Sequence, residues 1–164
     1  MACSVVRASS KSTVARATVL LEEALTTVQA IGLTWDIPII STLLGHLARQ
    51  QQRYALARAR YREALALYRT FGSPAYTATC LEGFAATLCA EGYYAQATRL
   101  CATASTLREQ VQTPLPPAER EPFEQTLATA KASVDEPTFG EEWTIGARLT
   151  HDQAIDYALS DACV

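Results

Sequence analysis

Apolar residues recur along the chain with the period of an α-helix, and residues 53–72 show this most clearly. Five apolar positions of this stretch lie within about 80° of Tyr54 on a helical wheel of about 100° per residue. They are Ala57, Tyr61, Ala64, Leu65 and Tyr68. The arginines border this stripe on both sides and do not form a face of their own. The pattern predicts an amphipathic helix that packs against neighbouring helices.

The same helix recurs at a shift of forty residues. Tyr54 matches Tyr94 at this shift. Further pairs are Ala57 with Ala97, Ala64 with Ala104, and Leu67 with Leu107, and the backward shift leads to Ala17, Ala24, Leu25 and Gly32. A fixed period of this size is typical of stacked helical arrays, in which each unit buries its apolar face against its neighbours.

Further helices are predicted between these copies. Asp36 is a candidate N-cap, and Ser73 precedes a proline suited to a first helical turn. Gly32 and Gly72 suit the left-handed positions that end helices. The predicted helices span about 13–31, 36–51, 53–71, 74–91 and 93–110.

Residues 43–67 resemble a tetratricopeptide repeat. The positions that match the motif are Leu44, Gly45, Tyr54, Ala57, Tyr61 and Ala64, and the next unit repeats them less completely with Phe84, Ala85, Gly92, Tyr94, Ala97 and Ala104. The unit of forty residues is longer than the usual repeat of about 34. The resemblance implies an all-α, antiparallel helix-hairpin array that forms a superhelix with a concave groove.

The tail, residues 111–164, starts with a proline-rich break. After it we expect a helix that begins near Glu119 or is kinked at Pro122, a short helix after Asp135, and a last helix behind a Thr150–Gln153 capping box. The chain then divides into a flexible N-terminus (1–12), helical repeats (13–110) and a C-terminal extension that caps the array (111–164).

The tail also resembles the end of LuxR-type and related ATPase transcriptional regulators of bacteria. The residues that carry this resemblance are 107–120, 139–150 and 154–159. It implies a regulator-like role in signal transduction. The nucleotide-binding GxxxxGK[ST] loop of such ATPases does not occur in this sequence.

The distribution of charge along the chain bears on the kind of partner that it binds. The net charge is −3; residues 53–72 carry five arginines against one glutamate, or +4, so the rest of the chain sums to −7. This balance argues against a dedicated nucleic-acid binder.

Five cysteines without a CxxC motif predict reduced thiols, neither disulfides nor a metal site. With no signal peptide or apolar stretch of membrane-spanning length, we expect a cytoplasmic protein without membrane contact.

The arginine-rich helix 53–69 allows a second interpretation. Arg58, Arg62 and Arg69 could form a basic patch for nucleic acid, but their positions beside the packing stripe favour side chains that cover its edges. Residues 119–142 contain seven carboxylates against two basic residues. We expect these acids, or those of a second chain, to neutralise the arginines.

Catalysis is not predicted. The chain has two histidines, and His46 and Cys89 share one predicted surface without an orienting third group. No cofactor is implied.

The repeat resemblance implies that the first helix of each hairpin, at 36–51 and 74–91, lines the concave groove. We call these two the first-type helices. The groove residues are Thr42, His46, Arg49, Gln50, Glu82, Ala86 and Cys89. We expect a protein or peptide partner here, with a homo-oligomer left open. The alternatives are that the tail partly fills the groove, that a pocket between array and tail senses a small molecule, or that the arginine-rich helix binds nucleic acid.

Overall fold

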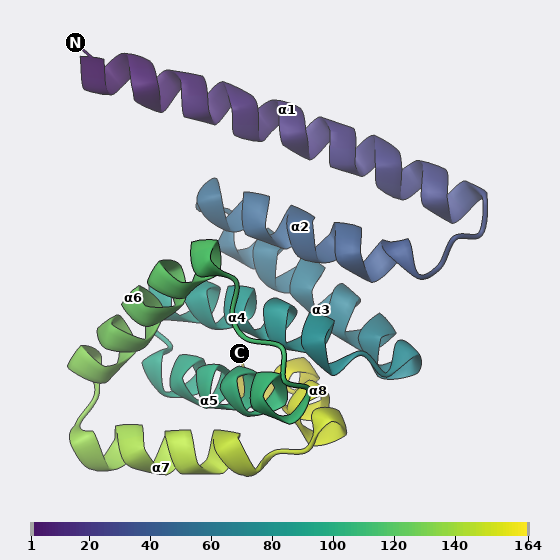
Figure 1. The fold of residues 1–164 in the computed structure, drawn as a ribbon. Coiled ribbons are helices and arrows are strands. Elements are labelled where there is room, and N and C mark those ends of the chain that lie inside the picture. Colours follow the sequence, from purple (N-terminus) through teal and green to yellow (C-terminus); the bar gives the residue numbers. More distant parts are fainter. Residues whose placement is uncertain (1, 164) are drawn as a thin grey trace.

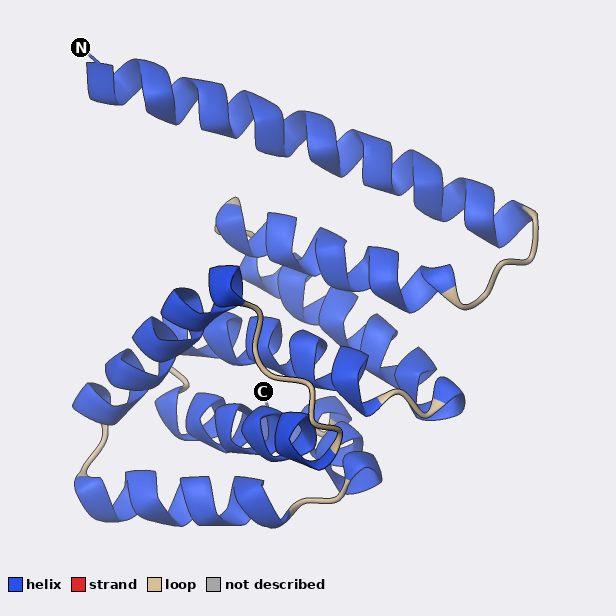
Figure 2. Cartoon of the chain, in the orientation of Figure 1, coloured by secondary structure: helices blue, strands red, loops and turns tan. Residues whose placement is uncertain are grey.

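The computed structural model describes residues 2–163, with side chains for 12–160, 162 and 163. Regular structure in this part of the chain is helical throughout (Figures 1 and 2). The α-helices are α1 (Ala2–Ala30), α2 (Asp36–Gln50), α3 (Tyr54–Phe71), α4 (Pro74–Ala90), α5 (Tyr94–Gln110), α6 (Pro117–Ser133), α7 (Glu136–Arg148) and α8 (His151–Leu159). A short 3₁₀-helix, η1, covers Asp161–Cys163.

Helices α2 to α5 form two consecutive hairpins, α2–α3 and α4–α5, which stack side by side (Figure 1). Their bounds agree with the predicted helices to within one residue. The all-α hairpin array predicted from the repeat is therefore confirmed.

Left-handed residues mark the helix ends at a regular interval. Positive φ angles occur at Gly32, Gln52, Gly72, Gly92 and Gln112, so the described chain turns every twenty residues from α1 to α5. The left-handed conformation predicted for Gly32 and Gly72 is confirmed, with φ of 75° and 61°. Gln52 and Gln112 adopt it without the freedom of glycine, which is uncommon for residues with a Cβ atom.

Tyr61 lies at the centre of the core. The whole predicted stripe of α3 is buried, and the Tyr61 ring stacks on Phe84 with ring centroids 5.9 Å apart. The ring fits between α2 and α4 because both present a glycine to it: a Cβ atom at Gly45 or Gly83 would lie 2.6 or 2.8 Å from ring carbons of Tyr61. Two glycines therefore make room for one large aromatic side chain.

The tail helices wrap around the array. Helix α7 approaches the α5 backbone closely at Gly146, where a Cβ atom would clash with the carbonyl oxygen of Arg99. The Thr103 hydroxyl donates to the Gly146 carbonyl at 2.9 Å, and Arg99 binds Glu142 through two hydrogen bonds of 2.6 and 2.9 Å. Helix α8 packs on α3, and its predicted capping box at Thr150 is confirmed.

Three helix starts differ from the predictions. Helix α1 begins at Ala2 and not near residue 13, because no glycine or proline interrupts residues 2–30. Flexibility of residues 1–12 stays a prediction, since the side chains of 1–11 lie outside the described set. Helix α6 begins at Pro117 and contains Pro122, whose missing N–H would have bonded to the exposed first turn of the helix. The alternative, a kink at Pro122, stays a prediction. Asp36 is the first residue of α2 and not its cap.

Candidate functional site

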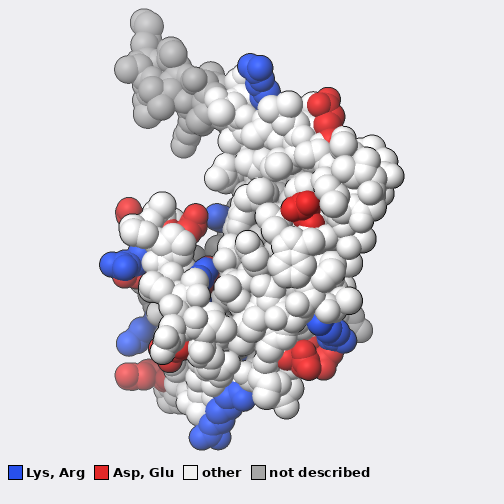
Figure 3. Space-filling view, turned by 45° about the vertical axis from the view of Figure 1, so that its right-hand side comes forward, with Lys and Arg blue, Asp and Glu red and all other residues white. Residues whose placement is uncertain are grey.

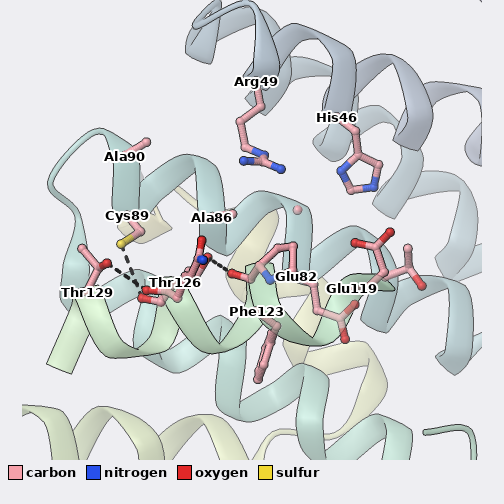
Figure 4. Close-up of a pocket in the computed structure, with 14 residues that line it drawn as sticks. His46, Arg49, Glu82, Ala86, Cys89, Ala90, Glu119, Phe123, Thr126 and Thr129 are labelled. Atoms are coloured by element: carbon pink, nitrogen blue, oxygen red, sulfur yellow. Dashed lines mark hydrogen bonds between the residues drawn. The ribbon is translucent and has the colours of Figure 1, made fainter. Parts of the chain in front are cut away.

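A cavity of about 290 Å³ lies between α2 and α4 of the array and α6 of the tail (Figure 4). Five of the seven predicted groove residues line it: His46, Arg49, Glu82, Ala86 and Cys89. The structure therefore brings together residues from two first-type helices, at the spacing that the repeat implies.

The other two predicted groove residues lie elsewhere. Thr42 is only 4% exposed; its hydroxyl donates to the Pro38 carbonyl at 2.8 Å and lies 3.4 Å from the Tyr68 hydroxyl. The prediction for Thr42 is wrong because its hydroxyl satisfies its own helix backbone, which lets the residue be buried between helices. Gln50 lines a neighbouring cleft.

This neighbouring cleft has a volume of about 320 Å³ and opens between α1 and α2. Ala17 and Leu21 form its α1 side, and Leu43 and Leu47 form its α2 side. It shares His46, Arg49 and Glu119 with the first cavity. The two hollows therefore adjoin one another in one groove, and both have mixed apolar and polar walls.

The residues of the far wall of the cavity were not among those predicted, although a pocket between array and tail was one of the alternatives. This wall comes from α6, which contributes Glu119, Phe123, Thr126 and Thr129 among others. The half-buried Phe123 packs against the core of the array. The apolar spacing of this tail helix was the available signal, but its contact with α4 depends on the path of the proline-rich loop.

His46 is held as a neutral acceptor or donor at the base of the groove. Its Nδ1 atom lies 3.0 Å from the Tyr61 hydroxyl. Burial, and secondarily the nearby Arg49 guanidinium, lowers the pKa of His46 to about 4. Burial likewise raises the pKa of the Tyr61 hydroxyl. Both groups are therefore uncharged at neutral pH, and they offer hydrogen bonds without charge.

Within the described chain, one charged side chain of the groove is paired with an opposite charge, and two others are not. Glu82 accepts two hydrogen bonds from Arg108, of 2.5 and 2.8 Å, although its burial raises the pKa of the carboxyl group. Arg49 and Glu119 form no ion pair within the described part of the chain, and the Arg49 Nε atom is buried there without a hydrogen-bond partner. These two side chains are thus the charged groups that an incoming partner would meet.

His46 and Cys89 line the same cavity, yet they do not form a catalytic pair. Cys89 donates to the Thr126 carbonyl at 3.6 Å, whereas His46 contacts Tyr61. Burial raises the pKa of the Cys89 thiol, which disfavours the nucleophilic thiolate. Among the described residues, no cluster of three or more His, Cys, Asp or Glu side chains could hold a metal ion.

The arginines of α3 contact other parts of the chain. Arg58 binds Glu91 at 2.9 Å, Arg62 donates to the Ser160 carbonyl at 3.2 Å, and Arg69 binds Asp156. Neutralisation by residues 119–142 is therefore a wrong prediction, because the partners lie at the end of α4 and in α8. In the face drawn in Figure 3, basic and acidic side chains are interspersed, without a patch of one sign.

Comparison with protein families matches residues 36–111 to the tetratricopeptide repeat. The match spans α2 to α5, so this part of the chain is similar to a tetratricopeptide-type array, in agreement with the sequence motif. Such repeats generally mediate protein–protein interaction and are generally non-catalytic scaffolds. The comparisons with curated proteins and with solved structures found no match. Within residues 2–163, no helix has the length and apolar character needed to cross a membrane.

Proposed function

We propose that this tetratricopeptide-type array binds a segment of a partner protein in the groove that runs from the α1–α2 cleft to the cavity beneath α6. The observation that carries the proposal is that the two hollows adjoin one another and share His46, Arg49 and Glu119. A protein-binding role agrees with the general function of the repeat family. We infer no catalytic step.

The chemistry of the groove favours a mixed apolar and polar segment. Leu43, which is 44% exposed, and Leu47 offer an apolar seat at the α1 end. Arg49 and Glu119 can each bind a charge of opposite sign, and the uncharged His46 can add a hydrogen bond. Such a surface selects by shape and a few polar contacts, since its own charges nearly cancel.

The proposal assigns different roles to the repeats and to the C-terminal tail. Residues 13–110 supply the repeats, and residues 111–164 close one side of the groove through α6. A regulator-like role is supported only by the resemblance of residues 107–120 and 139–150 to LuxR-type regulators. A cytoplasmic location also stays a prediction. We do not extend the proposal to nucleic acid, because Arg58, Arg62 and Arg69 contact the chain itself.

Selection from a random peptide library displayed on phage tests the proposal. The full chain should enrich a common sequence pattern, and synthetic peptides of that pattern should bind it in solution. Ala86→Trp should abolish this binding, because the indole would fill the cavity that Ala86 lines. Ala66→Trp is the matched control, since Ala66 is exposed on α3 away from the groove and should leave binding unchanged.

Two results would contradict the proposal. One is a library that yields no common pattern; the other is peptide binding that Ala86→Trp leaves intact while the variant melts like the wild type.

A small-molecule ligand is the second candidate function. The observation that favours it is that the 290 Å³ cavity is walled by both the array and the tail helix α6; this is near the lower end of the volumes of ligand pockets. A metabolite library should then contain a compound that raises the melting temperature of the wild type but not of Ala86→Trp. If every compound acts equally on both proteins, this candidate is wrong.

A further inference from the structure

One flank of α1 has the residue spacing of a coiled-coil seam. Its members follow one another at alternating intervals of four and three residues, the spacing that keeps apolar side chains on one line of a helix. They are Thr13, Ala17, Leu20, Ala24, Thr27 and Ile31. Leu20 is 57% exposed and Ile31 is 64% exposed, so the described chain leaves the largest members of this seam uncovered.

Helix α2 covers the face of α1 next to the seam. On the α1 side, the cluster between the two helices contains Leu21, Ala24, Leu25 and Val28, whose centre lies about 70° around the helix from the seam. Ala24, like Ala17 in the neighbouring cleft, therefore lies at the border between the seam and the face that α2 covers. These two alanines correspond, at the shift of forty, to Ala57 and Ala64, which are fully buried in α3. Helix α3 packs against both α2 and α4, whereas α2 is the one helix of the described chain with an extensive contact to α1.

No helix of the described chain folds back onto the seam. The left-handed residue Gln52 makes the turn that precedes α3, and Gly92 makes the turn that precedes α5. The corresponding position, Ser12, lies inside the continuous helix α1. Within the described chain, the hairpin partner that covers the equivalent flank of α3 is therefore not formed at α1, which leaves Leu20 open to contact with another molecule.

We propose that a second copy of this chain covers the seam, with the two α1 helices packed antiparallel about a twofold axis. The charges beside the seam favour this arrangement. Arg16 and Glu23 each directly precede a seam alanine, and both are exposed. When Ala17 faces Leu20 of the second copy, the antiparallel register places Arg16 opposite Glu23 of that copy, and symmetry repeats the pair.

A parallel pair would lack this complementarity. It would place Arg16 beside Leu21, and Glu23 beside Val28, each of the second copy. The small side chains of Ala17 and Ala24 allow the two backbones to approach closely, and Leu20 fills the space between them. This proposal concerns self-association and is tested separately from the proposed function of the groove, although Ala17 borders both the seam and the α1–α2 cleft.

Charge reversal tests the interface, with sedimentation velocity of the full chain over a range of concentrations as the measurement. The wild type should show a reversible dimer. Arg16→Glu and Glu23→Arg, made singly, should each weaken dimerisation by about tenfold or more, because each places like charges opposite one another. Arg16→Glu combined with Glu23→Arg should restore the dimer, because the pairs are re-formed with the signs exchanged.

Glu22→Arg is the matched control. Glu22 is exposed on the flank of α1 opposite the seam, so its reversal should leave dimerisation unchanged. A wild type that stays monomeric at every concentration would overturn the proposal. So would a combined variant that associates no better than the single variants, or a Glu22→Arg effect as large as theirs. Circular dichroism of each variant verifies that the helical content is retained.

Discussion

The two hairpins of the array share one backbone plan but fill their interiors with different side chains. Tyr61 and Tyr68 of α3 correspond at the shift of forty to Cys101 and Arg108 of α5, and all four residues are buried. The first hairpin thus places large rings where the second places a small thiol and a guanidinium group.

This difference in the size of the buried side chains changes what packs against each hairpin. The Tyr61 ring of the first hairpin occupies the space between Gly45 of α2 and Gly83 of α4, the first helix of the second hairpin. In the second hairpin, Arg108 reaches Glu82 across α4 and α5, and α6 and α7 pack over helices with many small residues. Large side chains thus fill the contact between the two hairpins, whereas small ones let the tail helices approach closely. The tail is therefore attached mainly where the repeat is poorest in large residues.

Truncation of the central ring should break the first hairpin most severely. Tyr61→Ala should lower the free energy of unfolding by about 3–5 kcal/mol, because the cavity left between the two glycines cannot collapse. Chemical denaturation monitored by circular dichroism measures this loss. Tyr61→Phe is the control; it removes only the hydroxyl contact with His46 and should cost about 1 kcal/mol. Equal losses for both variants would place the stabilisation in the hydroxyl and contradict this view.

Loss of the buried ion pair in the second hairpin should lower the free energy of unfolding. The side chains of Arg108 and Glu82 are 9% and 12% exposed. Arg108→Met should cost about 3 kcal/mol, since it leaves the Glu82 carboxylate buried without its partner. Replacing both residues, with Arg108→Met and Glu82→Leu, should recover most of this stability. Urea denaturation tests both variants, and a double variant as unstable as the single one would disprove the explanation.

Sensitivity to acid should distinguish the first hairpin from the second. The pKa of His46 is lowered from 6.5 to about 4, so the unfolded chain takes up the proton first as the pH falls. His46 should therefore reduce the free energy of unfolding progressively between about pH 6.5 and pH 4. The upper bound is about 3 kcal/mol, and partial exposure should bring it to about 2 kcal/mol.

His46→Gln isolates this effect from the titration of carboxylates. The difference in unfolding free energy between the wild type and this variant should change across the same pH range. A constant difference from pH 7 to pH 4 would show that His46 titrates normally in the folded protein.

The smallest expected effect concerns the ion pairs of α3. Arg69 and Asp156 are 44% and 67% exposed, so Arg69→Ala should change the free energy of unfolding by less than about 0.5 kcal/mol. Arg58 and Glu91 are less exposed, at 23% and 19%, and Arg58→Ala should cost about 1 kcal/mol. Thermal melting of the two variants compares them. A larger effect at Arg69 would mean that α8 contributes more to the first hairpin than its exposed contacts indicate.

Local periodicity predicted most of the array. The α3 stripe and the ends at Gly32 and Gly72 depend on contacts within one helix or between adjacent helices, and a helical wheel represents those well. Five of the predicted groove residues line one cavity for the same reason. Thr42 was misplaced because a wheel does not show that its hydroxyl bonds within its own helix.

Contacts between distant segments were not predictable from spacing. The partners of Arg62 and Arg69, Ser160 and Asp156, lie 98 and 87 positions away in the chain. The position of α6 over α4 likewise depends on how the loop after Gln112 turns, for which no repeat offers a template. Charge counting found acidic residues in the tail but could not say which of them meets α3.

The left-handed residues at 32, 52, 72, 92 and 112 allow a whole helical unit to be removed from the array. Any two of these positions separated by forty residues end helices of the same type, so residues 53–92 could be excised and the ends joined in frame. The shortened chain would keep a left-handed residue at the end of each remaining helix from α1 to α5. Modularity of this kind means that the number of hairpins can change without redesign of any turn, whereas an insertion of a few residues within a helix would disturb all the packing beyond it.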